Sequence, residues 1–255
     1  MELAQARAVV TGGASGLGQA VARRIVGAGG RVTLLDIQEQ AGEATRQALG
    51  ESASFRRCDV SDAAAVDAAV RAAAADMGGL TLAVSCAGVV TPGRLLGRDG
   101  PLDAAVFARV LAINLGGTFN VARVAADVMQ HNAANADGER GVIVSTASVA
   151  AFEGQVGQVA YAASKAGVAG MVLPLARELA RFGVRVMAIA PGLFATPMMA
   201  ILPQEAQDSL AAQVPFPPRL GRPEEFADLV ASIYGNPMLN GSTIRLDGAI
   251  RMQPK

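Results

Sequence analysis

Short apolar runs alternate along the chain with longer alanine-rich segments whose apolar residues recur at helical spacing. The runs predict strands at 8–10, 31–36, 54–57, 82–85, 141–145, 185–190 and 243–246. The segments between them predict helices at 16–28, 38–49, 62–77, 103–129 and 156–182. Ser61 is the expected N-cap of the third helix, and a last helix is expected to begin at Pro223, a residue suited to a first turn.

Strands that alternate with helices of this length indicate βαβ units and a parallel sheet covered on both faces. The runs 142–144 and 186–190 are continuously apolar, as buried parallel strands require. We therefore expect one α/β domain over residues 1–255. Two segments interrupt the alternation. Residues 91–101 read as a loop, and the proline-rich stretch 191–218 is either a substrate lid or holds short helices.

Composition narrows the possible functions. Hydrophobic residues make up 51% of the chain and charged residues only 17%, which argues against disorder. Lysine plus arginine equal aspartate plus glutamate, 22 against 22, so no basic excess points to nucleic acid or an anionic membrane. No run reaches the ~18 uninterrupted apolar residues of a membrane span. The first strand begins close to Met1, so we expect no targeting segment and a cytoplasmic protein.

The scarcity of metal ligands excludes several kinds of site. Cys58 and Cys86 are the only cysteines and have no short spacing, so neither zinc binding nor a disulfide framework is indicated. His131 is the only histidine and falls in a polar stretch that reads as a loop. A serine-hydrolase triad is therefore not expected.

A glycine-rich turn separates the first strand from the first helix. Gly12, Gly16 and Gly18 have the spacing G-x-x-x-G-x-G, with Ser15 and Leu17 between them. Glycines there let the backbone turn sharply and approach a pyrophosphate, which the free amides of the helix N-terminus can bind. Such a motif alone could be only a tight turn.

The acidic residue that follows makes the nucleotide interpretation stronger. Asp36 ends the second strand, where a carboxylate can accept hydrogen bonds from ribose hydroxyls and repel a 2′-phosphate. The alternative is that it only caps the next helix. Asp59 and Val60 follow the third strand and could contact adenine in the same groove. Strand, glycine turn, helix and acid occur in the expected order, so we predict an NAD site.

A second constellation carries the candidate chemistry. Tyr161 and Lys165 are four residues apart on a predicted helix, so they share one face, and Ser148 follows the fifth strand. Oxidation of a secondary alcohol needs a base for the hydroxyl proton. A nearby ammonium is expected to favour the tyrosine phenolate and lower its pKa. Ser148 could donate to the substrate oxygen, and Asn114 could hold a water that relays protons past Lys165.

Each of these residues also has a plain structural interpretation. A tyrosine and a lysine four apart are often a surface pair, the serine could be an N-cap, and the asparagine a buried residue with local partners. Their combination behind a dinucleotide turn favours catalysis.

With these motifs, the sequence resembles the short-chain dehydrogenase/reductase family over nearly its whole length. The resemblance rests on the glycine turn, the Asn114 segment, the Ser148, Tyr161 and Lys165 set, and Pro191-Gly192. It implies a doubly wound Rossmann sheet of about seven parallel strands, assembled as dimers or tetramers. Carried over by position, it implies cofactor contacts at Gly12, Ser15, Gly16, Leu17, Gly18, Asp36, Asp59, Val60, Cys86, Ala87, Gly88, Tyr161, Lys165, Pro191, Gly192 and Phe194.

Longer strings are similar to one subgroup, the type 2 short-chain 3-hydroxyacyl-CoA dehydrogenases, also called 17β-hydroxysteroid dehydrogenases type 10. The strings are residues 146–158, 191–194, 213–217 and 246–252. This likeness implies an acyl-CoA substrate, a role in fatty acid metabolism, no metal, and an approach of Gln155 to the substrate. One departure is Ser85-Cys86-Ala87-Gly88, where the family usually has an asparagine first.

Several functions remain open on the sequence. The leading hypothesis is NAD-dependent oxidation of a 3-hydroxyacyl-CoA. A 3-oxoacyl reductase acting on carrier-bound chains with NADPH is the second, although Asp36 opposes a 2′-phosphate. A steroid or other secondary-alcohol dehydrogenase is the third. A non-enzymatic scaffold is disfavoured because the tyrosine, the lysine and the glycines are all present.

Overall fold

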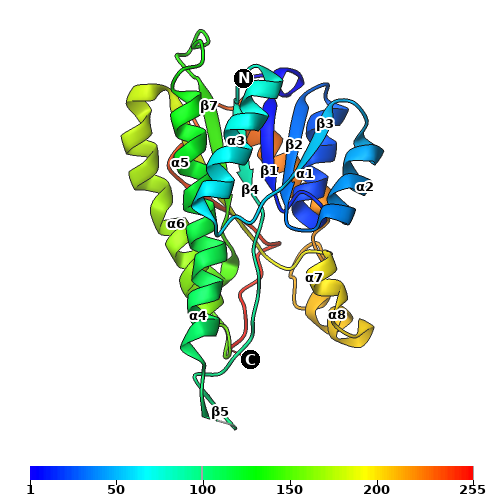
Figure 1. The fold of residues 1–255 in the computed structure, drawn as a ribbon. Helices are drawn as coiled ribbons and strands as arrows, with labels where there is room; N and C mark the ends of the chain where they lie inside the picture. The colour runs from blue at the N-terminus through cyan, green and yellow to red at the C-terminus, as the bar shows by residue number, and fades with distance from the viewer. Residues whose placement is uncertain (99, 255) are drawn as a thin grey trace.

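A single parallel sheet organises the molecule (Figure 1). The computed structural model describes residues 1–98 and 100–254. Seven strands pair in the order β3-β2-β1-β4-β7-β8-β9, and every pairing in this sheet is parallel. Their bounds are Arg7–Thr11 (β1), Arg31–Asp36 (β2), Ala53–Arg57 (β3), Leu82–Ser85 (β4), Gly141–Thr146 (β7), Val184–Pro191 (β8) and Thr243–Leu246 (β9).

Helices cover both faces of this sheet, because alternate residues of each central strand point to opposite sides. One core joins Val9, Ala83 and Ile143 to α3, α5 and α6, and the other joins Val10, Val84 and Val144 to α1 and α9. The helices are α1 (Gly16–Gly27), α2 (Glu39–Leu49), α3 (Ala63–Met77), α4 (Ala104–Leu111), α5 (Gly117–Met129), α6 (Val159–Leu179), α7 (Pro197–Ala200), α8 (Gln204–Ala211) and α9 (Pro223–Gly235).

The carboxyl edge of the sheet carries the irregular segments. Figure 1 shows α7, α8, the β5 hairpin and the segment leading to the C-terminus at this end of the molecule. The strand order reverses between β1 and β4, and ligands of open α/β sheets bind at such a reversal. The segment 191–218 holds two short helices, α7 and α8, which lie at this same edge, where a ligand is expected to bind.

The sequence predicts this framework closely. All seven predicted strands are present, the doubly wound parallel sheet is confirmed, and the last helix begins at Pro223 as expected. Two predictions need correction. Asp62, not Ser61, caps α3: its carboxylate accepts hydrogen bonds from two amides of the first turn. The 91–101 loop contains a small antiparallel pair, Leu96–Gly97 (β5) and Gly100–Pro101 (β6), with residue 99 outside the described residues.

Both long apolar helical stretches differ slightly from prediction. The 103–129 helix is interrupted by a π-helical turn, Ala112–Gly116, and the 156–182 helix begins only at Val159, after Gly157 with φ of 87°. The stretches Ala104–Met129 and Val159–Phe182 are long and apolar enough to cross a membrane by length and composition. Only 28% and 33% of their most apolar windows are buried, so each presents an apolar outer face.

Candidate active site

The glycine turn between β1 and α1 has no room for a side chain at Gly12 or Gly18. Gly12 has φ of 64°, and a Cβ atom there would lie 2.9 Å from the amide nitrogen of Ala87. A Cβ atom on Gly18 would lie 2.3 Å from the carbonyl oxygen of Gly12. Ser15 is the N-cap of α1 but makes no side-chain capping bond within the described part of the chain. The N-terminus of α1 therefore presents backbone amides at a surface only glycine can form.

Asp36 lies directly beside this turn. Its side chain is 8% exposed at the end of β2. Oδ2 accepts a hydrogen bond from the amide of Ala14 (3.1 Å), and Oδ1 accepts one from the amide of Gln38 (3.0 Å). The carboxylate thus anchors the glycine turn and the start of the segment toward α2 at the same time. The N-cap of α2 is Gln38, so Asp36 does not cap that helix, and a ribose contact stays a prediction.

The opposite wall of the groove is the end of β4. Thr11 Oγ1 accepts hydrogen bonds from the amides of Cys86 and Ala87, both at 3.2 Å. Burial raises the pKa of the Cys86 thiol to about 11, so it is a neutral lining group, not a nucleophile. Ser85, which replaces the usual asparagine of this motif, has a buried hydroxyl without a partner among the described residues. Thr11 therefore holds this end of β4.

Ser148 and Tyr161 meet at the carboxyl end of β7. Ser148 is 8% exposed, and its Oγ accepts a hydrogen bond from the amide of Ala150 (3.1 Å). It is also the N-cap of a 3₁₀ turn, Val149–Ala151, so the N-cap interpretation is confirmed and the catalytic role stays a prediction. Tyr161 lies in the first turn of α6. Burial raises the pKa of its phenol, and a hydrogen bond with Ser148 acts in the opposite direction.

Lys165 lies one turn further along α6 and is 5% exposed. Its Nζ donates to the carbonyl oxygen of Thr146 (2.7 Å) and lies 5.8 Å from the centre of the Tyr161 ring. Burial lowers the pKa of Lys165 to about 8. The expected lowering of the tyrosine pKa is not present in this structure, because burial of the phenol raises its pKa by more than the hydrogen bond with Ser148 lowers it.

Asn114 lies in the π-helical turn and is fully buried. Its Oδ1 accepts from the amide of Val89 (2.8 Å), while Nδ2 donates to the carbonyl of Val89 (2.9 Å) and to Ser164 Oγ (3.0 Å). The side chain thereby ties the segment after β4 to α6. A Cβ atom on Gly88 would lie 3.1 Å from Asn114 Oδ1 and 3.6 Å from Lys165 Nζ, so these groups line one site.

Comparison with known proteins identifies the framework. A family model described as short chain dehydrogenase matches residues 6–207. The chain belongs to the short-chain dehydrogenase family. The human 3-hydroxyacyl-CoA dehydrogenase type-2 is 52% identical over 251 residues, which cover 97% of this chain and 95% of the human protein. The Drosophila melanogaster protein of the same name is 49% identical over 248 residues, covering 96% and 97%.

A solved structure extends this similarity to the fold. The crystal structure of 3-hydroxyacyl-CoA dehydrogenase type-2 from Mycobacterium avium matches with a TM-score of 0.93 and 44% identity, covering 97% of this chain and 96% of that one. The family and subgroup resemblance drawn from the sequence is therefore confirmed.

In this short-chain dehydrogenase, the predicted cofactor residues Pro191, Gly192 and Phe194 lie at or just after the end of β8. Pro191 ends β8, and the amide of Gly192 donates to Leu246 (2.9 Å), so both lie at the carboxyl edge. Phe194 is 7% exposed, and its ring packs on Gly221, so its backbone rather than its ring is free to face a ligand.

The predicted adenine contacts lie at the outer end of the groove. The side chain of Asp59 is exposed and accepts hydrogen bonds from the amide and hydroxyl of Ser61, which lower the pKa of the carboxyl. Val60 is buried, packs against Gly117, and its carbonyl accepts from Asn120 (2.9 Å).

Gln155 lies away from the cofactor groove, in a different hollow. It lines a cavity of about 460 Å³ between residues 93–96 and 154–162, which includes the first turn of α6. Its Nε2 donates to the carbonyl oxygen of Gln253 (2.9 Å). The approach of Gln155 to the substrate stays a prediction.

Sequence reasoning missed several residues that build the site. Thr11 and Thr146 act through a hydroxyl and a backbone carbonyl, and Ser164 through its contact with Asn114. A carbonyl carries no sequence signal, because every residue has one. Thr11 precedes the glycine turn, and its position at the end of β1 could have indicated a role.

Proposed function

We propose that this protein oxidises the 3-hydroxyl of a 3-hydroxyacyl-CoA to a ketone, with NAD as hydride acceptor. The observation that carries the proposal is the meeting of Ser148, Tyr161 and Lys165 at the carboxyl edge, next to the glycine turn and Asp36. Relatives that are about half identical over nearly the full chain carry the name 3-hydroxyacyl-CoA dehydrogenase type-2.

The residues present fit a dinucleotide. A Cβ atom would fill the turn at Gly12 and Gly18, the first amides of α1 face it, and a buried carboxylate ends β2. Asp36 would hold the adenosine ribose, Asp59 and Val60 the adenine side, and Cys86, Ala87 and Gly88 the opposite wall. When bound, the nicotinamide would supply the hydride acceptor.

The side chains divide the proton chemistry between them. Tyr161 takes the proton from the substrate hydroxyl as general base, and Ser148 donates a hydrogen bond to the same substrate oxygen. Lys165 supplies positive charge near the phenol and can hold the nicotinamide ribose. Asn114 holds the segment after β4 against α6 through Val89 and Ser164, so a water for proton exchange would have to bind to a lone pair that these contacts leave free.

The substrate is proposed to enter from the side of the cavity that Gln155 lines. The segment 191–218 would act as the lid, since Thr196 and Pro197 lie against the position of a Cβ atom on Gly16. This contact brings the first lid helix over the glycine turn, so cofactor and lid would meet there.

A second candidate is a 3-oxoacyl reductase that uses NADPH. Asp36 opposes it, because a 2′-phosphate would meet a buried carboxylate already engaged with two amides. Oxidation of steroids or other secondary alcohols remains a further activity of the same site, since the chemistry of Tyr161 does not depend on the acyl group.

The deciding experiment follows NADH absorbance on adding NAD and a panel of 3-hydroxyacyl-CoA thioesters, with steroids and simple secondary alcohols as comparison. We expect turnover with the thioesters and a higher kcat/KM than with the other alcohols. Better turnover with steroids would move the substrate assignment to them. No turnover with any secondary alcohol would favour the scaffold alternative.

We also propose a homotetramer or homodimer. The stretches Ala104–Met129 and Val159–Phe182 present apolar outer faces, on which Phe119 and Leu173 are each 45% exposed. Burying such faces between copies removes apolar surface from water. Sedimentation at micromolar concentration should give a dimer or tetramer, and a monomer there would contradict the proposal. A cytoplasmic location and a role in fatty acid metabolism remain predictions.

A further inference from the structure

The last residues of the chain pack along the loop that joins the two predicted catalytic side chains. This loop runs from Ser148 at the end of β7 to Tyr161 in α6. The amide of Val156 donates to the carbonyl of Pro254 (3.0 Å), and Gln155 Nε2 donates to that of Gln253 (2.9 Å). The loop and the C-terminal segment are thus joined by one backbone–backbone and one side chain–backbone hydrogen bond.

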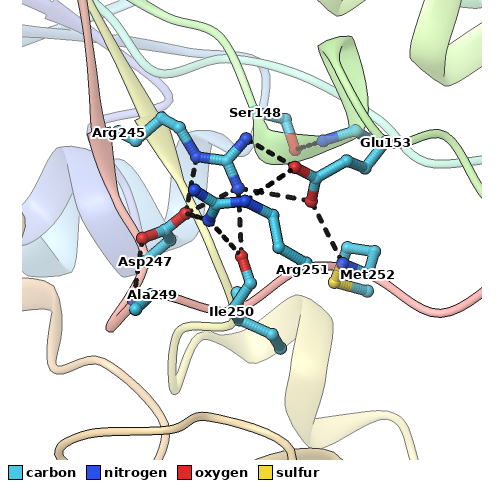
Figure 2. A network of polar contacts seen from close by, with 9 residues as sticks. Ser148, Glu153, Arg245, Asp247, Ala249, Ile250, Arg251 and Met252 are labelled. Atoms are coloured by element: carbon cyan, nitrogen blue, oxygen red, sulfur yellow. Dashed lines mark hydrogen bonds and ion pairs between the residues drawn. The ribbon is translucent and has the colours of Figure 1, made fainter.

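Glu153, in the middle of this loop, is the main polar anchor. Its carboxylate accepts hydrogen bonds from both terminal nitrogens of Arg245 (2.8 and 3.2 Å) and from the amide of Met252 (3.1 Å). Arg251 lies 3.3 Å from the same carboxylate. Figure 2 shows Glu153 facing both guanidinium groups, with Ser148 on the adjoining backbone. These hydrogen bonds lower the pKa of Glu153, so it is charged at neutral pH.

Arg245 connects the loop to the sheet. It lies in β9 opposite Ala190 of β8, close to the strand end where Pro191 and Gly192 face the cofactor edge. Its guanidinium also contacts Asp247 Oδ2 (2.7 Å) and the carbonyl of Ile250 (3.0 Å), and lies 5.7 Å from the Phe152 ring. One rigid side chain therefore fixes the loop, the turn after β9 and the C-terminal segment together (Figure 2).

We call Glu153, Arg245, Asp247 and Arg251 the C-terminal clamp. We propose that Glu153 and Arg245 are positioning residues for hydride transfer, which hold the Ser148–Tyr161 loop in its reactive geometry through the C-terminal clamp. The inference rests on the proposed roles of Ser148 and Tyr161. Neither clamp residue touches the reacting atoms, so the clamp acts only through the loop.

The geometry explains why charged groups are used here. Glu153 and Arg245 are 22% and 24% exposed, so water screens them only in part. A two-pronged guanidinium–carboxylate contact fixes orientation as well as distance, which an apolar contact would not do. The loop contains Gly154 and Gly157, so its own backbone is poorly restrained. Without the clamp, the loop would keep only three hydrogen bonds to other segments, from Gly93 to Gly157 and from Val156 and Gln155 to the C-terminal segment, among the described residues.

The test compares Glu153→Gln with wild type, because the amide keeps the shape and removes the charge. We expect kcat for 3-hydroxyacyl-CoA oxidation to fall by roughly 10- to 100-fold, since small displacements of reacting groups cost this much. The Kd for NAD should not change. Asp228→Asn is the matched control: it breaks the exposed Arg24–Asp228 pair on α1 and α9 and should leave kcat unchanged.

Two further measurements separate positioning from simple stability. Adding Glu153→Gln to Arg245→Met should lower kcat by less than Glu153→Gln does in the wild type, because the Glu153–Arg245 contact is already lost. Hydrogen exchange at the Val156 amide should become faster in Glu153→Gln, while the melting temperature stays within the range of the Asp228→Asn control.

A Glu153→Gln variant with wild-type kcat would overturn the inference, even if the loop exchanges faster. A kcat loss that only parallels a lowered melting temperature would overturn it as well. Wild-type protein without turnover on any alcohol would instead defeat the proposed function. In that case, only hydrogen exchange at the Val156 amide would test whether the C-terminal clamp holds the loop. An exchange rate that does not change in Glu153→Gln would contradict the proposal.

Discussion

Replacing Tyr161 with phenylalanine should nearly abolish turnover while leaving the affinity for NAD close to normal. Loss of a general base commonly lowers the rate by ~10²–10⁴-fold. The ring itself stays, so the packing of α6 against the 3₁₀ turn after Ser148 is kept. The measurement is kcat for 3-hydroxyacyl-CoA oxidation together with NAD binding by titration. A Tyr161→Phe variant with near-wild-type kcat would refute the assigned base.

The structure adds a condition to this expectation. Burial raises the pKa of Tyr161 and lowers that of Lys165 to about 8. Oxidation needs the phenolate, whose fraction grows with pH, whereas reduction needs the neutral phenol. The oxidation rate should therefore rise and the reduction rate fall as pH increases through the range in which Tyr161 titrates. If both directions respond to pH in the same way while chemistry limits the rate, proton transfer does not depend on Tyr161.

Ser148→Ala provides the matched comparison for Tyr161→Phe. Removing the hydroxyl takes away one hydrogen bond that favours the phenolate, along with the proposed donor to the substrate oxygen. We expect a smaller loss than in Tyr161→Phe and a shift of the oxidation profile to higher pH, because a hydrogen bond to the charged form lowers a pKa. Together the two variants separate the proton acceptor from the group that assists it.

The sheet could be predicted because its strands have a strong local signal. The runs 31–36, 82–85 and 243–246 coincide with β2, β4 and β9. The central strands β7 and β8 are fully buried, and their predicted runs 142–144 and 186–190 are continuously apolar for that reason. The start of α6 could not be placed as well, because Gly157 adopts a positive φ that its neighbours do not reveal. Helix capping by Asp62 was missed since Ser61 is an equally suitable cap type.

Some residues of the site could also be predicted from the sequence, and others could not. Asp36 and Tyr161 could be found because their chemistry requires one residue type at one spacing from a recognisable turn or helix. The pKa of Tyr161 could not, because it depends on how deeply the phenol is buried and on its hydrogen bond with Ser148, 13 residues earlier in the chain. Glu153 and Arg245 are 92 residues apart, and only the pairing of β9 with β8 brings them together.

NAD should be strongly preferred over NADP, and we expect Asp36 to be the cause. Its carboxylate is buried at the edge of the glycine turn, at the end of β2, where a Rossmann fold would hold the adenosine ribose. Juxtaposed like charges cost several kcal/mol, which corresponds to a preference on the order of 100-fold or more in kcat/KM. Ile37, Gln38 and Gln40 follow without a positive charge that could offset this repulsion.

Removing the acid alone should not create NADP use. In Asp36→Ala, the amides of Ala14 and Gln38 lose their acceptor, and a buried amide without a partner costs about 1–3 kcal/mol. The glycine turn should therefore loosen, and NAD binding should weaken for this reason as well as through the lost ribose contact. Asp36→Asn keeps an acceptor oxygen without the charge, so it separates these two effects.

The double variant Asp36→Ala with Ile37→Arg should narrow or reverse the preference. Ile37 is 58% exposed, so an arginine there can extend into the groove without disturbing the core, and a guanidinium binds a phosphate with two hydrogen bonds. The measurement is kcat/KM for NAD and NADP in wild type, in both single variants and in the double variant. Ile37→Arg alone should change the preference little, because Asp36 would still repel the phosphate.

Arg57 carries a positive charge near Asp36 that could bind a 2′-phosphate, so it needs a separate control variant. It pairs with Asp36 in the β2–β3 register, is exposed, and its charge acts on Asp59, so it lies at the adenine end of the groove. If Arg57 offered a phosphate site, Arg57→Gln would lower NADP use in the double variant and leave NAD use unchanged. Equal or better use of NADP than NAD by the wild type would defeat the role assigned to Asp36. The 3-oxoacyl reductase would then become the leading function, because nothing else in the groove opposes a 2′-phosphate as directly as this carboxylate.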